Sequence, residues 1–128
     1  MNKIEAIQIA NNFIAIDIKK VDWFVAIEPY IKAIIFYGSR AKGTNREDSD
    51  IDILIILPLE QEEKYTVGEY MYNYKNTEIN IVLRSIEKLR TLAQEKKDAF
   101  QKEVFRESEI LLDTDGEVTN LLKEISTI

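Results

Sequence analysis

Hydrophobic and polar residues recur with two different periods along this chain, and the period predicts which segments are helices and which are strands. Apolar residues recur at helical spacing over residues 3–19, where Asn2 is placed to cap the helix, and again over 21–27. Two short runs rich in β-branched residues, 31–37 and 50–57, predict buried strands. These two strands are the most apolar part of the chain, so we expect them at the centre of a sheet.

The second half of the chain continues this alternation of helices and strands. Residues 59–76 predict one amphipathic helix with an acidic start, whose buried side would carry Val67, Met71 and Tyr74. The tyrosines of this segment are expected to pack on the sheet rather than to form a base-stacking platform. The remaining elements predicted are a strand over 77–83, a helix over 84–95 capped by Ser85, a helix over 96–108, a strand over 109–113, a turn at Asp115 and Gly116, and a helix over 118–125.

This order of elements predicts an α/β fold. The 128 residues suffice for one domain, 1–128, with one core. We expect a small, mixed and strongly bent sheet with helices packed mainly on one face and with the strands 31–37 and 50–57 adjacent. No internal repeat, low-complexity tract or linker divides the chain.

Composition narrows the possible chemistry. The chain has no cysteine and no histidine, which excludes disulfides, thiolate or imidazole zinc sites and His-based proton transfer. A net charge of −6 argues against binding to duplex nucleic acid, which draws mainly on lysine and arginine. No apolar run is long enough for a membrane span and no signal peptide is recognisable, so a cytoplasmic location is expected. Catalysis would have to use carboxylates, hydroxyls, basic side chains or a hard metal ion.

The candidate chemistry lies between the two central strands. Asp50 and Asp52 are two residues apart at a strand entrance, so their side chains point to the same side. Two adjacent carboxylates repel each other unless a cation lies between them, and oxygen ligands of this kind suit Mg²⁺. Gly38 allows a sharp turn and a close approach to a ligand, and Ser39 offers a hydroxyl and a backbone N–H to an anion.

Three further side chains in this segment are candidates for nucleotide binding. Either Arg40 or Lys42 would neutralise phosphate charge. Ser49 would either orient a carboxylate or cap the turn. The stretch 38–52 therefore predicts a phosphate-binding turn beside a metal site. Taken singly, a Gly-Ser turn or an Asp-x-Asp pair is more often only a turn or a solvated strand entrance; the combination is far more specific.

The combination resembles a known family signature. Gly38-Ser39, ten residues and then Asp50-x-Asp52 is similar to the signature of the DNA polymerase β-like nucleotidyltransferases. More narrowly, Gly38-Ser-Arg-Ala-Lys-Gly43 with Ser49-Asp-Ile-Asp52 resembles the minimal nucleotidyltransferases (MNT) that are paired with HEPN toxins. The resemblance implies a polymerase β palm-like fold, an NTP donor, with ATP expected, transfer of NMP to a hydroxyl, and release of pyrophosphate.

The resemblance also implies a third acidic residue on a neighbouring strand. Glu78 is the best match, although aspartate is commoner at that position in the family. Asn80 lies on the same side of the strand, occupies the other candidate position and cannot serve as a base. Asp50, Asp52 and Glu78 are therefore the predicted catalytic and metal-binding residues of a two-metal site, in which Glu78 shares the second metal ion or accepts the proton of the acceptor.

The chain is short for an enzyme that binds its own acceptor. The resemblance implies that the acceptor belongs to another protein, namely a HEPN-type toxin adenylylated on tyrosine, in a homo- or hetero-oligomer. Transfer to aminoglycosides is less expected because a second helical domain is missing. A different reading is a binding antitoxin or nucleotide sensor that keeps the fold and turns over poorly, and the departure from aspartate at the third acidic position favours it.

Overall fold

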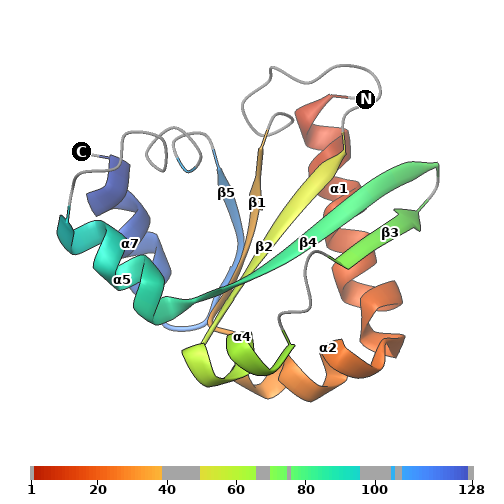
Figure 1. Ribbon diagram of the computed structural model, residues 1–128. Coiled ribbons are helices and arrows are strands. Elements are labelled where there is room, and N and C mark those ends of the chain that lie inside the picture. The colour runs from red at the N-terminus through yellow and green to blue at the C-terminus, as the bar shows by residue number, and fades with distance from the viewer. Residues whose placement is uncertain are drawn as a thin grey trace.

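The computed structural model places a five-stranded sheet between helices (Figure 1). It describes residues 2–38, 50–65, 70–74, 76–95, 105 and 108–126. Within these ranges no helix is long and apolar enough to cross a membrane.

The sheet has the strand order β3-β4-β2-β1-β5 and is mixed. β2 and β4 are parallel, and the other three pairs of neighbours are antiparallel. The predicted pairing of the two most apolar strands is confirmed, because β1 and β2 are adjacent at the centre. The strands are β1 (Ala33–Tyr37), β2 (Ile51–Leu57), β3 (Tyr70–Tyr74), β4 (Thr77–Ser85) and β5 (Glu109–Asp113).

Helices cover both faces of this sheet (Figure 1). One face is covered by α1 (Lys3–Asn12), which continues as a π-helix (Phe13–Asp17) and a 3-10 turn (Ile18–Lys20), and by α2 (Asp22–Ile27). The other face is covered by α5 (Ile86–Glu95) and α7 (Glu117–Ser126). The short helix α4 (Leu59–Tyr65) follows β2.

The sequence predicts helices mainly on one face of the sheet, but helices cover both faces. Two buried clusters explain this difference. Successive side chains of a strand point to opposite faces. In β2, Ile53 and Ile55 join the cluster under α1 and α2, whereas Leu54 and Ile56 join the cluster under α5 and α7. Because this central strand is apolar on both sides, each face has to be covered. The fold class itself, a mixed sheet with helices, is confirmed.

The largest difference from the sequence prediction lies in residues 59–76. A single helix was predicted there, but α4 ends at Tyr65 and residues Tyr70–Tyr74 form strand β3. The tyrosines at 70, 72 and 74 recur with a period of two, and aromatic side chains favour strands. Met71 was predicted to be buried; it points to the other side of β3 and is 59% exposed.

The tyrosines of β3 pack against the N-terminal helices. The rings of Trp23 and Tyr70 stack with centroids 4.0 Å apart. The indole N–H of Trp23 donates a hydrogen bond to the hydroxyl of Tyr72 at 2.7 Å. Phe13 contacts the rings of Tyr72 and Tyr74. The tyrosines therefore pack against other elements, but from a strand onto helices and not from a helix onto the sheet as predicted.

Several local predictions are confirmed by hydrogen bonds. Asn2 caps α1, because its side-chain oxygen accepts from the backbone N–H of Glu5 at 2.9 Å. Ser85 caps α5 by accepting from the backbone N–H of Lys88 at 3.0 Å. The predicted strand over 109–113 is β5. Most of the predicted helix over 96–108 lies outside the described residues, but Phe105 is helical and buried.

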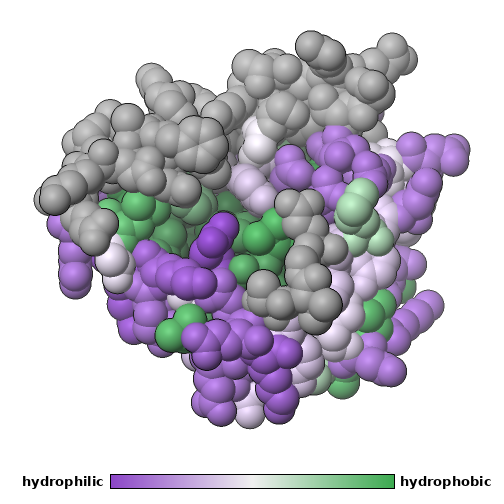
Figure 2. Space-filling view, viewed as in Figure 1, coloured by the Kyte–Doolittle hydropathy of each residue, from purple (hydrophilic) through white to green (hydrophobic). Residues whose placement is uncertain are grey.

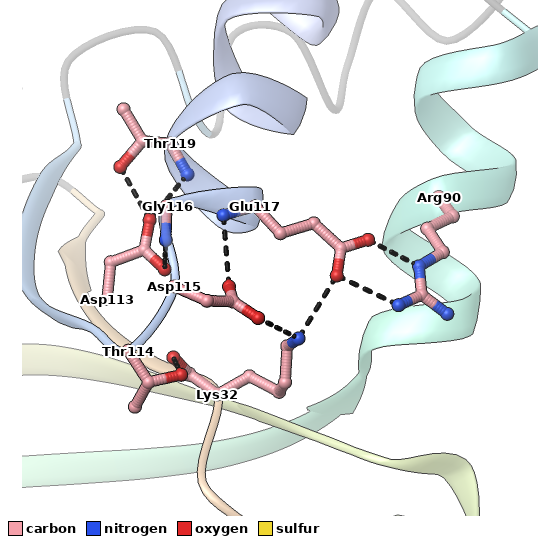
Figure 3. Close-up of polar contacts among 8 residues, drawn as sticks. All are labelled: Lys32, Arg90, Asp113, Thr114, Asp115, Gly116, Glu117 and Thr119. Carbon is pink, nitrogen blue, oxygen red and sulfur yellow. Dashed lines mark hydrogen bonds and ion pairs between the residues drawn. The ribbon is translucent and has the colours of Figure 1, made fainter.

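A charged network joins the residue before β1, helix α5, and the turn between β5 and α7 with the start of α7 (Figure 3). The ammonium group of Lys32 donates to Asp115 at 2.7 Å and to Glu117 at 3.1 Å. The guanidinium of Arg90 donates two hydrogen bonds to Glu117, at 2.6 and 2.8 Å. Asp113 accepts from the backbone N–H groups of Gly116 and Thr119 and so fixes the start of α7. The network holds α5 and α7 together at the end of β5.

This network predicts a loss of stability in acid. The hydrogen bonds from Arg90, assisted by Lys32 and opposed by slight burial, lower the pKa of Glu117 from 4.5 to about 2. At about 1.4 kcal/mol per pKa unit this corresponds to roughly 3 kcal/mol. Because the side chains of Arg90 and Glu117 are 44% and 30% exposed, solvent screening reduces the expected contribution to about 1–2 kcal/mol.

The folded chain binds the Glu117 proton less tightly than the unfolded chain, so the stabilisation is complete above pH about 4.5 and disappears as the pH falls through about 2. Urea unfolding of Glu117→Gln is therefore expected to show a deficit against wild type at pH 6 that shrinks towards pH 2. Glu63→Gln, at an exposed position of α4, should follow the wild-type curve. A deficit that does not change with pH would contradict the prediction.

Candidate nucleotidyl-transfer site

The candidate site lies at the edge of the sheet where β1 ends and where β2 and β4 begin. Tyr37, the last residue of β1, is the register partner of Asp52 in β2. Asp52 is in turn the register partner of Asn80 in β4. Directly paired residues of neighbouring strands point to the same face, so these side chains share the face that α5 and α7 cover further along. In Figure 2, hydrophilic residues gather over the starts of β2 and β4.

Gly38 turns the chain away from β1 in direct contact with Asp52. Its φ angle is +85°, a left-handed conformation that side chains rarely adopt. A Cβ atom at this position would lie 2.3 Å from Oδ2 of Asp52. Because Gly38 has no side chain, there is room for the carboxylate of Asp52. The sequence predicts a close approach of Gly38 to a ligand; in the structure the close approach is to Asp52, a residue of the candidate site.

Asn80 links the two aspartates. Its amide nitrogen donates to a carboxylate oxygen of Asp50 at 2.9 Å and lies 3.5 Å from a carboxylate oxygen of Asp52. The prediction that Asp50 and Asp52 point the same way is therefore supported by one donor group that reaches both. The side-chain oxygen of Asn80 is buried and has no hydrogen-bond partner among the described residues.

Glu78 lies beside Asp50 and is half-buried, like the other members of the cluster. A hydrogen bond between the two carboxyl groups, slight desolvation and the negative charge of Asp50 together raise the pKa of Glu78 above its ordinary value. The structure thus brings Glu78 to Asp50, whereas Asn80 occupies the register position opposite Asp52. Of the predicted nucleotide-binding residues, Ser39, Arg40, Lys42 and Ser49 lie outside the described residues.

The donor atoms of the cluster fit a hard divalent cation. In the described ranges no group of three or more His, Cys, Asp or Glu side chains is arranged to hold a metal ion. The donors present are the carboxylates of Asp50 and Asp52, with the amide of Asn80 between them. Mg²⁺ commonly takes one or two protein carboxylates and completes its shell with water and substrate phosphate. Two half-buried carboxylates, one immediately before β2 and one within it, are such a donor set.

Comparison with known proteins identifies the family. The model of the polymerase β nucleotidyltransferase family matches residues 19–117, which is well over half of the chain. The chain belongs to this nucleotidyltransferase family. The matched residues run from the 3-10 turn before α2, through α2 and the whole sheet, to the start of α7. Nucleotidyl transfer is the general activity of the family, and its members usually use an NTP and a divalent metal ion.

A solved structure shows the same nucleotidyltransferase fold. The crystal structure of a nucleotidyltransferase-like protein from Exiguobacterium sibiricum 255-15 aligns with a TM-score of 0.58 and 14% sequence identity. The alignment covers 85% of this chain and 37% of that protein, so this chain spans little more than a third of its length. At this identity the likeness concerns the fold alone. No match is found among the curated proteins.

The sequence analysis did not place two residues of β3 next to the candidate site. Met71 and Asn73 of β3 are the register partners of Asn80 and Glu78, so they extend the same face of the sheet. Both are exposed. The helix predicted over 59–76 does not place them on the sheet, although the period of two between Tyr70, Tyr72 and Tyr74 indicates a strand.

Proposed function

We propose that this chain is a Mg²⁺-dependent nucleotidyltransferase that transfers AMP from ATP to a hydroxyl group of a partner protein. The observation that carries the proposal is the convergence of Asp50 and Asp52 beside the Gly38 turn, with one amide group reaching both carboxylates. In the reaction, the acceptor oxygen bonds to the α-phosphorus of ATP while the bond from that phosphorus to the bridging oxygen breaks. Pyrophosphate leaves, and the hydroxyl proton passes to a carboxylate.

The roles of the residues follow from their chemistry. Asp50 and Asp52 would hold the cation, and Glu78, which is hydrogen-bonded to Asp50, would share a second cation or accept the acceptor proton. A bound Mg²⁺ supplies charge stabilisation to the phosphates and to the leaving pyrophosphate. Gly38 keeps the backbone close to Asp52, and Ser39 with Arg40 or Lys42 would bind the triphosphate.

The partner that we propose is a HEPN-type toxin, modified on tyrosine and thereby inactivated, so that the chain acts as its antitoxin. The resemblance of the Gly38 and Asp52 segments to minimal nucleotidyltransferases supports this partner.

A second candidate is an antitoxin that neutralises its partner by binding and has little transfer activity. The observation that favours it is the neutral Asn80 opposite Asp52. An amide brings no negative charge to the cation site, and fewer charged ligands bind a divalent ion more weakly. Such an antitoxin would keep the fold and the nucleotide site. It would form a complex with its partner, and the partner would not be modified.

Labelled ATP separates the two candidates. The chain is incubated with MgCl₂, the product of the neighbouring gene, and ATP labelled on either the α- or the γ-phosphate. Nucleotidyl transfer predicts protein-bound label from α-labelled ATP and none from γ-labelled ATP. A stable complex of the two proteins without α-label would support the binding module. Label from the γ-phosphate alone would overturn nucleotidyl transfer in favour of phosphoryl transfer.

A further inference from the structure

Asn80 is in an unusual hydrogen-bonding position. Its side chain has two groups to satisfy, an NH₂ donor and an oxygen acceptor. The NH₂ group lies between Asp50 and Asp52, at 2.9 and 3.5 Å from their oxygens. The oxygen is buried and has no hydrogen-bond partner among the described residues.

The orientation of this amide has a physical reason. Ionised carboxylates only accept hydrogen bonds, so the NH₂ group is the only end of an asparagine that can face two of them. Hydrogen bonds to a charged acceptor are about twice as strong as those between neutral groups. Among the described residues, the side chain therefore keeps its nitrogen between the two carboxylates while its oxygen accepts no hydrogen bond.

We infer that Asn80 is a positioning residue that takes the place of a cation in the metal-free chain. Its amide nitrogen stabilises Asp50 and Asp52 side by side, and its neutrality keeps the affinity of the site for divalent ions low. The inference rests on the proposed metal-dependent function of this site. It makes two claims of its own, one about the stability of the metal-free chain and one about the binding of the ion.

The neighbouring strand offers a matched control. Asn73 of β3 is the register partner of Glu78, so it lies on the same face, near the cluster and exposed. The described structure gives it no hydrogen bond to Asp50 or Asp52. Asn73→Asp and Asn73→Ala therefore make the same chemical changes near the site without removing the bridging amide.

The test measures thermal unfolding without metal and the binding of MgCl₂ and MnCl₂ by calorimetry, in the chain of 128 residues. Asn80→Ala and Asn80→Asp are both expected to lower the metal-free Tm by about 3–6 °C, because two charge-assisted hydrogen bonds are lost. Asn80→Asp is also expected to bind the ions about tenfold more tightly, since it adds a carboxylate. Asn73→Ala and Asn73→Asp should stay within about 1 °C and about twofold of wild type.

Two results would overturn the inference. One is an Asn80→Ala chain whose metal-free Tm equals that of Asn73→Ala. The other is an Asn80→Asp chain that binds Mn²⁺ no more tightly than Asn73→Asp. A different result would contradict the proposed function, namely that the wild type transfers no α-label. Even then, the comparison of metal-free Tm values between Asn80→Ala and Asn73→Ala would still decide the role of the amide.

Discussion

Replacing Asp52 by asparagine is expected to lower the rate of nucleotidyl transfer at least ~1,000-fold, which corresponds to about 4 kcal/mol of transition-state stabilisation. Asp52 lies at the centre of the cluster, between Gly38 and Asn80, and its charge would hold the cation on the phosphates. Asparagine has the same shape and keeps an acceptor oxygen, so the free energy of unfolding should stay within about 1 kcal/mol of wild type. Transfer of α-label and urea unfolding measure the two effects.

The control for Asp52→Asn is the same substitution at Asp22. This aspartate is exposed in the first turn of α2, on an element that covers the other face of the sheet. Asp22→Asn is expected to retain full transfer activity. If Asp52→Asn kept a tenth or more of the wild-type rate while folding normally, the proposed role of the Asp-x-Asp pair would be wrong.

Replacing Gly38 by alanine is expected to reduce transfer about 100-fold or more, because a misplaced catalytic group loses its alignment. The new methyl group would lie 2.3 Å from Oδ2 of Asp52, so that either the carboxylate or the turn has to move. The φ angle of +85° adds backbone strain. We expect the chain to lose about 1–3 kcal/mol of stability as well.

Gly116 separates these two effects. It has nearly the same backbone conformation, with a φ angle of +82°, but a Cβ atom there would meet nothing within 4 Å. Gly116→Ala is therefore expected to lose about 1 kcal/mol through strain alone and to keep its transfer activity. If Gly38→Ala were no less active than Gly116→Ala, the contact between Gly38 and Asp52 would have no role in positioning the carboxylate.

Secondary structure was predictable wherever one period dominated a segment. β1 and β2 were recognisable as buried strands because they are short, apolar and rich in β-branched residues. β3 was not recognised, since its inward tyrosines also fit a helical spacing when Met71 is counted with them. The strand is stabilised by its pairing with β4 and by the contact between Trp23 and Tyr70, and neither contact is visible in local sequence.

The local sequence pattern also did not predict that helices cover both faces of the sheet. The apolar runs of β1 and β2 indicate burial, but they do not say which later helices return to which face. α5 and α7 reach the second face because Ile86, Leu89 and Val118 complete the cluster around Ile35 and Leu54. The charged network around Glu117 joins residues from three distant segments and is likewise a product of the tertiary fold.

By itself, the sequence determined the pair of carboxylates and the turn beside it. A spacing of two on a strand places Asp50 and Asp52 on one side, and a glycine after a strand permits the turn, because both follow from backbone geometry alone. Only the tertiary structure decided that Asn80, rather than Glu78, lies across from Asp52. That pairing depends on the register between two parallel strands joined by a long connection, and a register is fixed by the packing of whole strands rather than by any local pattern.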